Sequence, residues 1–264
     1  MYFLSDFKGY AYRLGFKTIE QAEKDYLQEL LLRAIFSKIP ERRLVFRGGT
    51  ALSKVYSTGR ASDDLDFVYD YEDKDRLKRQ VEEAVNSLAD LYPVKTTEEK
   101  PYRDMLGYKV KINGPLYTER NDSSSQAVSI DINTYEKVVL KPASIIRIPI
   151  YTDIPPYTIT IKQLEELFVD KLFALVERKR LSARDLYDIW IILRKGYAMD
   201  EKKLKEIYGY YADKKTVSYD GLLQKIDKIG DIWDDEINML TNANAGFKVV
   251  KEDVVKRLKP LLPG

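Results

Sequence analysis

The stretch from Phe46 to Asp70 most constrains the fold, because it joins a short apolar run, two glycines and a segment with alternating aspartates. Residues 44–46 are typical of a buried strand that stops at Gly48-Gly49, and a helix can begin at Thr50. Glycines permit close approach of the backbone to a ligand, and the first turn of a helix offers unpaired N–H groups to an anion. The stretch therefore predicts a site for phosphate groups.

Two carboxylates follow on the next predicted strand. Side chains alternate along a strand, so Asp64 and Asp66 are expected on one face and Leu65 and Phe67 on the other. Neighbouring carboxylates raise one another's pKa unless a cation lies between them, and Mg²⁺ binds carboxylates together with water and phosphate oxygens. The order of the two motifs favours phosphoryl or nucleotidyl transfer. The alternative is a simple turn followed by a solvated strand edge, since either motif alone is common without a function.

The absence of cysteine and histidine limits the chemistry that the chain can perform. Disulfides, thiolate metal sites, the usual general base and the usual zinc ligand are all excluded, which leaves carboxylates, Lys, Tyr, hydroxyls or a hard metal ion. The net charge is only +2, from 44 basic and 42 acidic residues, so charge alone does not indicate a nucleic-acid partner. Many Lys, Glu, Tyr and Ile residues are also typical of proteins from thermophiles.

Length and hydropathy predict a two-domain protein that is not inserted in a membrane. A chain of 264 residues is long for one core, and we expect residues 1–160 and 161–264 to form separate domains. No apolar span reaches the roughly 18 residues that cross a bilayer. The first ten residues, MYFLSDFKGY, lack the basic and apolar regions of a signal peptide, so we expect a cytoplasmic protein.

Helices and strands alternate in the first domain. A helix is expected from Thr18, with Thr18 and Gln21 as a capping box and Pro40 as its end. The other expected elements are a helix over Asp73–Leu91, strands at Leu106–Asn113 and Ala127–Asn133, a polar loop at Gly114–Ser125, and short strands and turns over residues 138–161.

A third carboxylate, Asp131, lies on the polar face of the predicted strand at Ala127–Asn133. In that place it can hold a second metal ion, or accept a proton from an attacking hydroxyl, beside Asp64 and Asp66. The alternative is an ordinary solvent-facing strand residue. We favour the functional interpretation because an Asp-x-Asp strand accompanies it.

The second domain is predicted to be helical, and its first helix carries a lysine near its apolar face. Lys171 lies on or beside that face of the helix expected over Lys162–Arg180, and Arg178 shares the face. Lys171 either extends to solvent or points into the cleft between the domains, where it would contact nucleotide phosphates.

The next helix is expected to begin at Ser182. Ser182 can cap it with Asp185 at the third position, so a structural role is available to Asp185. Arg184 and Asp188 lie one turn apart and can pair. Gly196 is expected to end this helix, and shorter helices follow at residues 201–211, 219–229 and 251–261.

Four motifs occur in a fixed order between Leu44 and Trp190 and together resemble the AbiEii/AbiGii-type nucleotidyltransferases, which are the toxin components of abortive-infection, type IV-like toxin–antitoxin pairs. The motifs are Gly48-Gly49-Thr50-Ala51-Leu52, Arg60-x-Ser62-x-Asp64-Leu65-Asp66-Phe67, Lys171-Leu172-x-Ala174 with Arg178, and Arg184-Asp185-Leu186-Tyr187-Asp188.

The resemblance implies an α+β fold. It consists of a mixed-sheet, polymerase-beta-like nucleotidyltransferase domain with flanking helices and an all-helical C-terminal domain that completes the nucleotide cleft. The resemblance also implies a nucleoside triphosphate as substrate and Mg²⁺ or Mn²⁺ as cofactor. The implied nucleotide-binding residues are Gly48, Gly49, Thr50, Arg60, Ser62, Arg178 and Arg184; the implied catalytic residues are Asp64, Asp66, Lys171, Asp185 and Asp188; and the implied metal ligands are Asp64 and Asp66, with Asp131.

The activity implied is transfer of a nucleoside monophosphate to an acceptor hydroxyl on RNA, notably tRNA, opposed by a protein antitoxin from a neighbouring gene. A second hypothesis keeps the chemistry but transfers the nucleotide to a small molecule or a protein. A third is a protein that binds nucleotide or antitoxin without catalysis. The near-neutral net charge keeps the second hypothesis open, because no basic stripe marks a path for RNA.

Overall fold

The structure is a computed structural model that describes residues 4–39, 43–70, 73–99, 105–119, 124–214, 217–242 and 245–262. The predicted helix end at Pro40 and part of the predicted loop at Gly114–Ser125 lie outside these residues.

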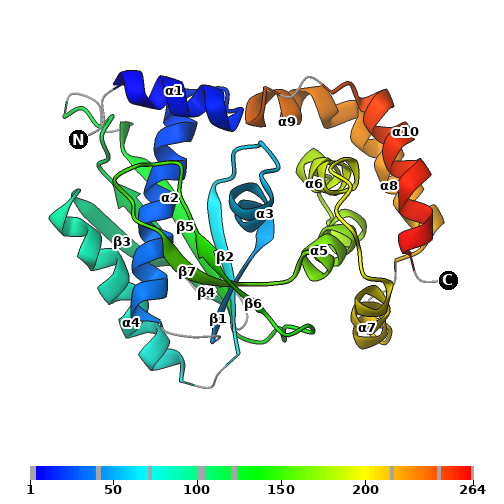
Figure 1. The fold of residues 1–264 in the computed structure, drawn as a ribbon, viewed down its shortest axis with the longest axis horizontal. Coiled ribbons are helices and arrows are strands. Elements are labelled where there is room, and N and C mark those ends of the chain that lie inside the picture. The colour runs from blue at the N-terminus through cyan, green and yellow to red at the C-terminus, as the bar shows by residue number, and fades with distance from the viewer. Residues whose placement is uncertain are drawn as a thin grey trace.

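A mixed sheet forms the centre of the N-terminal half (Figure 1). Within the described residues it has seven strands in the order β3-β4-β5-β2-β1-β7-β6. β2 runs antiparallel to β1 and parallel to β5, and β1 runs parallel to β7, so the predicted mixed sheet is confirmed. The strands are β1 (Leu44–Arg47), β2 (Asp64–Tyr69), β3 (Val94–Glu99), β4 (Met105–Ile112), β5 (Gln126–Asn133), β6 (Ala143–Arg147) and β7 (Tyr157–Ile161).

Helices cover both faces of the sheet and then continue as a separate helical layer. In Figure 1, α2 and α4 lie on one side of the sheet, whereas α3 lies between the sheet and the layer formed by α5 and α6. The helices are α1 (Leu4–Leu14), α2 (Ile19–Lys38), α3 (Gly48–Tyr56), α4 (Lys74–Asn86), α5 (Leu164–Glu177), α6 (Ala183–Arg194), α7 (Glu201–Tyr211), α8 (Tyr219–Ile229), α9 (Trp233–Leu240) and α10 (Phe247–Leu258).

Alternation along β2 sends its aspartates to the face opposite α2. Leu65 and Phe67 are buried, and the Phe67 ring lies 6.0 Å from that of Phe36 on α2. Asp64 and Asp66 therefore face the other way, toward α3 and the helical layer. The predicted separation of the two side-chain sets along this strand is confirmed.

The long helix α2 holds α3 in place through buried charges. Its predicted capping box is present, with Thr18 and Gln21 exchanging hydrogen bonds. Its buried side also carries charged residues, because Glu29 is fully buried and Asp25 nearly so. Both carboxylates pair with the buried Lys54 of α3, at 2.6 Å for Asp25 and 3.3 Å for Glu29. These pairs fix the helix whose first turn carries the two glycines.

Several elements differ from the sequence-based expectation. Helix α3 begins at Gly48 rather than Thr50, so both glycines lie in its first turn. Helix α10 begins at Phe247, earlier than predicted. The helices α1 and α9 and the edge strand β3 were not predicted; β3 has the sequence VKTTEE, which lacks an apolar alternation.

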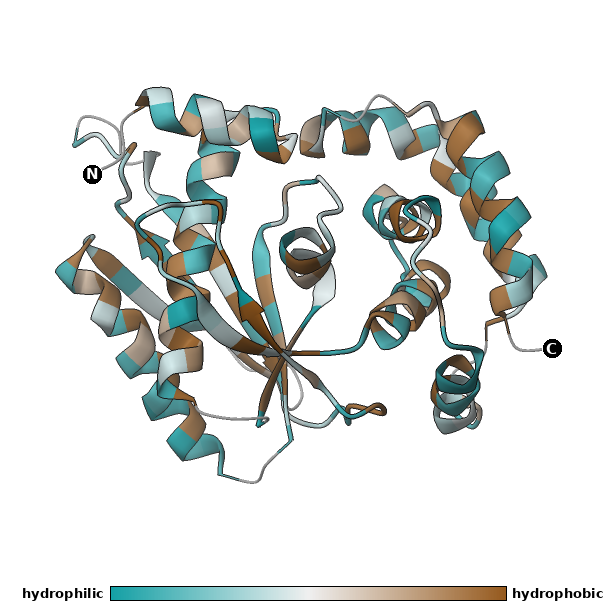
Figure 2. Cartoon of the chain, viewed as in Figure 1, coloured by the Kyte–Doolittle hydropathy of each residue, from teal (hydrophilic) through white to brown (hydrophobic). Residues whose placement is uncertain are grey.

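One hydrophobic core extends from Phe7 to Leu258, and Figure 2 shows apolar residues concentrated on the central strands. The two halves also exchange hydrogen bonds, since Thr241 Oγ1 donates to the Gly59 carbonyl at 2.6 Å and Ala61 N donates to the Leu240 carbonyl at 2.9 Å. The boundary at residue 160 stays a prediction.

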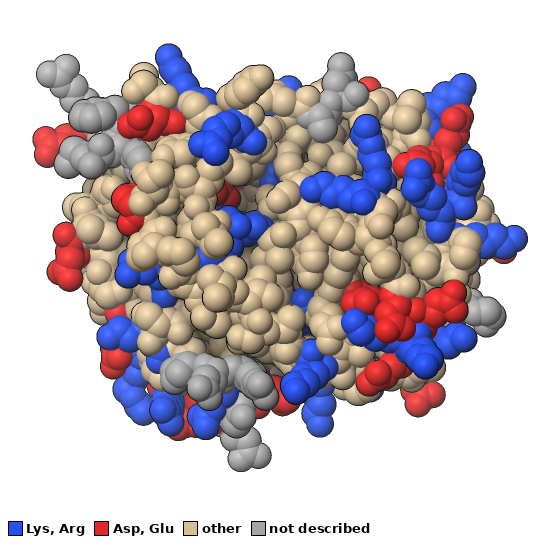
Figure 3. All heavy atoms as spheres, in the orientation of Figure 1, with Lys and Arg blue, Asp and Glu red and all other residues tan. Residues whose placement is uncertain are grey.

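Charges of both signs lie on the surface. On the face shown in Figure 3, Lys and Arg side chains are interspersed with Asp and Glu around the rim. None of the described helices is long and apolar enough to cross a membrane.

Candidate active site

Gly48 allows the backbone to approach the aspartates of β2. Its φ of +80° is a conformation that favours glycine, and a Cβ placed on it would lie 2.2 Å from Asp66 Oδ2. A Cβ on Gly49 would lie 2.3 Å from Arg60 Nη2. The two glycines therefore bring the first turn of α3 against Asp66 on one side and Arg60 on the other.

The hydroxyl of Thr50 makes a hydrogen bond within the fold. Its side chain is buried and its Oγ1 donates a hydrogen bond to the carbonyl oxygen of Asp64. This bond ties the first turn of α3 to the strand that carries the aspartates. Thr50 does not line the polar cavity described below, so a direct contact between its hydroxyl and a triphosphate stays a prediction.

Asp131 lies beside Asp66 in the sheet. The two residues are partners in the parallel register of β2 and β5, as are Asp64 and Ser129, and partners in register point to the same face. Asp131 does not line the cavity. Among the residues that the structure describes, no three acidic side chains approach closely enough to hold a metal ion, so a role for Asp131 as a metal ligand stays a prediction.

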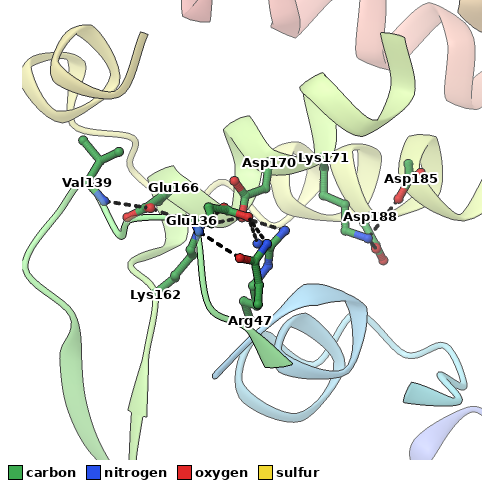
Figure 4. A network of polar contacts seen from close by, with 10 residues as sticks. Arg47, Glu136, Val139, Lys162, Glu166, Asp170, Lys171, Asp185 and Asp188 are labelled. Atoms are coloured by element: carbon green, nitrogen blue, oxygen red, sulfur yellow. Dashed lines mark hydrogen bonds and ion pairs between the residues drawn. The ribbon is translucent and has the colours of Figure 1, made fainter. Parts of the chain in front are cut away.

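Lys171 points inward from α5 and does not extend to solvent. It is 8% exposed, and its Nζ lies 2.9 Å from Asp185 Oδ1 and 2.9 Å from Asp188 Oδ2. Figure 4 shows the side chain reaching from α5 toward both aspartates of α6. Lys171 therefore links α5 to α6 at the edge of the cavity.

Asp188 is the buried centre of this ion-pair cluster. Its two oxygens accept hydrogen bonds from Arg60 Nε and Nη2, each at 2.6 Å, and Oδ2 also contacts Lys171. Burial alone would raise the pKa of Asp188, but Arg60 and Lys171 hold it below its ordinary value. The predicted pairing of Asp188 with Arg184 is wrong, because both carboxylate oxygens are engaged by Arg60 from the other half of the molecule.

The predicted cap of α6 is also wrong. Ser182 occupies the N-cap position, but its side chain makes no capping hydrogen bond. The carboxylate of Glu236 on α9 accepts a hydrogen bond from Ala183 N at 2.8 Å instead. Asp185 is consequently directed to Lys171 and Arg178, with Arg178 Nε 2.9 Å from its Oδ2.

One polar cavity is lined by residues of β1, α3, β2 and the loop between α3 and β2, which form its N-terminal wall, and by residues of α5, α6 and the segment between them, which form its helical wall. Ten of the predicted site residues line it, whereas Thr50, Asp131 and Asp188 do not. Four further lining residues were not predicted. The full lining consists of Arg47, Gly48, Gly49, Arg60, Ser62, Asp64, Asp66, Leu167, Asp170, Lys171, Ala174, Arg178, Arg184 and Asp185.

The unpredicted Arg47 connects the glycine turn to α5. It is the last residue of β1, pairs with Glu136 and lies 3.8 Å from Asp170. Lys162 contacts the same two carboxylates, each at 3.0 Å (Figure 4). These charges hold the pKa of Glu136 at about 2 in spite of its burial. Asp170 directly precedes Lys171 on α5, so this network fixes the start of α3 relative to α5.

Neither aspartate of β2 forms an ion pair with any residue in the described part of the chain. Burial raises the pKa of Asp66; Arg47 opposes the rise and Asp64 adds to it. Burial also raises the pKa of Asp64, to which the charge of Asp63 contributes. The pKa of Asp66 stays raised although Lys171 and Arg178 also lower it, and oxygen ligands suit hard cations, so Asp64 and Asp66 fit a divalent ion.

Known proteins resemble this chain in sequence family and in fold. A family model described as the nucleotidyl transferase AbiEii toxin of type IV toxin–antitoxin systems matches residues 30–252. A search of curated proteins found no match.

Two solved structures show the same fold at low sequence identity. MenT4, a nucleotidyltransferase toxin from Mycobacterium tuberculosis H37Rv, is 20% identical with a TM-score of 0.67, over 99% of this chain and 90% of that one. JHP933 from Helicobacter pylori is 18% identical with a TM-score of 0.56, over 90% of this chain and 92% of that one. Because the family model spans most of the sequence and both walls of the cavity, the chain belongs to the AbiEii family of nucleotidyltransferase toxins.

Proposed function

We propose that this nucleotidyltransferase moves a nucleoside monophosphate from a nucleoside triphosphate to a hydroxyl of an RNA acceptor, notably tRNA. The observation that carries the proposal is the cavity in which Asp64 and Asp66 face Lys171 and Arg178. An oxygen of the acceptor attacks the α-phosphorus, the bond to the β-phosphate oxygen breaks, pyrophosphate leaves and the hydroxyl loses its proton.

The N-terminal wall would hold the reacting end of the triphosphate. The first turn of α3, at Gly48 and Gly49, supplies backbone N–H groups close to Asp66. Asp64 and Asp66 are the residues that would hold Mg²⁺ or Mn²⁺, and such an ion supplies positive charge that stabilises the charge developing during the transfer.

The helical wall would neutralise the leaving phosphates. Lys171, Arg178 and Arg184 all line the cavity. Asp185 orients both Lys171, which lies within α5, and Arg178, which lies at the C-terminal end of α5. Removal of one such preorganised contact typically costs about 3 kcal/mol of transition-state stabilisation. Asp188 acts behind the cavity as a positioning residue, because Arg60 and Lys171 occupy its oxygens.

The proposal also includes a protein antitoxin that inhibits this activity, since the family is that of type IV toxins. A neighbouring gene whose product restores the growth of cells that express this chain would support this partner.

The experiment is a transfer assay with each of the four α-labelled triphosphates and total RNA, with Mg²⁺ or Mn²⁺ present or removed by a chelator. Label is expected on RNA, and the label should be lost with the chelator and in Asp64→Asn and Asp66→Asn. The matched control is Asp63→Asn, which removes a neighbouring carboxylate that does not line the cavity.

The remaining outcomes separate the alternatives. Label on a metabolite or on protein, with none on RNA, would show that the acceptor is not RNA. Triphosphate binding in a calorimeter without any transfer would contradict catalysis. Undiminished transfer in both Asp64→Asn and Asp66→Asn would contradict the assigned site.

A further inference from the structure

A groove extends from the catalytic cavity toward α9. It lies along the segment that joins α5 to α6, and Arg178 and Arg184 line both the groove and the cavity. Arg180, from the joining segment, and Met239 and Leu240, at the end of α9, line the groove alone. The two hollows are therefore neighbours that share the side chains of Arg178 and Arg184.

The groove is locally basic in a protein whose total charge is almost balanced. Arg180 and Arg184 form no ion pair with any residue that the structure describes. The one carboxylate at the groove wall, Glu236, accepts the Ala183 N–H. Arg178 is paired with Asp185, so Arg180 and Arg184 are the guanidinium groups of the groove that can bind the phosphates of a chain.

The opposite wall of the groove is apolar and exposed. Met239 is 69% exposed, beside half-buried Leu240 and two residues after buried Ile237. A flexible, polarisable thioether packs well against the flat face of a nucleobase, and such contacts tolerate different bases. Sites for single-stranded nucleic acid combine a basic groove with side chains that pack against bases, and Met239 is available here for such packing.

We propose that the acceptor reaches the catalytic cavity through this groove as a single-stranded RNA end. Arg180 contacts its phosphates and Met239 packs against one of its bases. The inference rests on the proposed function and adds the path of the acceptor and two residues outside the cavity that bind it. Arg184, shared by both hollows, lies where the acceptor end meets the triphosphate.

The test compares Arg180→Glu with Arg79→Glu, a matched charge reversal. Arg79 is exposed on α4, on the far side of the sheet, and forms no ion pair with the described residues. Binding of fluorescently labelled tRNA and of a short single-stranded RNA is measured by anisotropy at several salt concentrations, and transfer is measured as KM for RNA and KM for the triphosphate.

Arg180→Glu should weaken RNA binding about tenfold or more and reduce its salt dependence, because a phosphate contact is lost. KM for the triphosphate should stay within about twofold of the wild type, because Arg180 does not line the cavity. Arg79→Glu should change neither. Met239→Gln, which preserves side-chain length, should weaken RNA binding about threefold to tenfold.

Equal RNA binding by Arg180→Glu and Arg79→Glu would overturn the inference, as would a wild-type protein that binds neither RNA. If Arg180→Glu lost its circular-dichroism signal of folding, Arg180→Gln would replace it with the same expected direction. Transfer to RNA that persists unchanged in these variants would leave the proposed function intact while the groove assignment fails. If the wild type bound RNA in a way that depends on Arg180 but transferred no nucleotide, the proposed function would fail while the groove assignment held.

Discussion

The two pairs of aspartates at the cavity have opposite electrostatic environments. Asp64 and Asp66 on β2 are half-buried and form no ion pair with any residue that the structure describes, and burial raises the pKa of both. Asp188, the partner of Asp185 on α6, has Arg60 and Lys171 within 3 Å and a pKa below its ordinary value. Side chains of the protein therefore neutralise Asp185 and Asp188, whereas Asp64 and Asp66 have no such partner among the described residues, and we propose that a metal ion supplies it.

The largest expected effect follows removal of a charge from the incomplete pair. Asp66→Asn should lower the rate of nucleotide transfer by about 10³-fold, because an electrostatic contact to the reacting centre is lost. Its free energy of unfolding should not fall, since an ionised buried carboxylate without a partner is unfavourable. Single-turnover transfer and urea denaturation measure the two. A large loss of unfolding free energy in Asp66→Asn would show that the fold depends on this carboxylate as it does on Asp188, and would contradict the contrast between the two pairs.

The complementary change in the completed pair should act on stability. Asp188→Asn leaves Arg60 and Lys171 buried without their shared counter-charge. Breaking a buried pair in this way costs about 3–5 kcal/mol of unfolding free energy. Urea denaturation measures the loss, and an unfolding free energy within 1 kcal/mol of wild type, as an order-of-magnitude threshold, would contradict it.

Acid pH should reduce the difference between wild type and Asp188→Asn. The pKa of Asp188 is lowered in the fold, so its contribution is present above the unfolded value of about 3.9 and is lost as pH falls through the folded value. Denaturation of both proteins at pH 7 and at successively lower pH values measures this. A difference that grows below about pH 4 would be the opposite of the expected sign.

Gly48→Ala should affect the site more than the fold. A Cβ at this position would meet Asp66 Oδ2 and the positive φ would be strained, which costs about 1–3 kcal/mol. Transfer should fall because the carboxylate must move. Gly59→Ala is the matched control: its φ is also positive, at +72°, but no atom lies within 4 Å of the new Cβ. Equal transfer by the two variants would show that the close approach to Asp66 is unimportant.

The smallest expected effect concerns the network between the walls. Glu136→Gln removes a charge that pairs with Arg47 and Lys162, and should lower the unfolding free energy by about 1–3 kcal/mol at pH 7. Glu136 is 20% exposed, so its loss should cost less than that of Asp188. With a folded pKa of about 2, its contribution should be lost as pH falls from about 4.5 toward 2. Stability curves against pH measure the change.

Local periodicity predicted the parts of the site that lie on single elements. The opposite faces of β2 and the capping box at Thr18 each follow from spacing within one strand or helix. For Lys171 the same spacing left open whether the side chain extends to solvent or points inward, and the structure decided for the inward position. The family resemblance added the pairing of the two walls.

Contacts between distant segments could not be predicted in the same way. Arg47 and Glu136 are 89 residues apart, and neither lies in a motif that indicates the other. The cap of α6 comes from Glu236, 53 residues after Ala183, and it displaced the local cap that Ser182 suggested. Helix α3 includes the glycines because Lys54 and Thr50 fix it to α2 and β2.

The most direct test of the contrast between the two aspartate pairs is Mn²⁺ binding by calorimetry in the presence of a non-hydrolysable triphosphate. Wild type, Asp66→Asn and Asp188→Asn are compared at a temperature at which all three are folded. The account predicts that Asp66→Asn weakens Mn²⁺ binding by about tenfold or more, while folded Asp188→Asn stays within about threefold of wild type. Loss of Mn²⁺ binding in Asp188→Asn with retention in Asp66→Asn would contradict it.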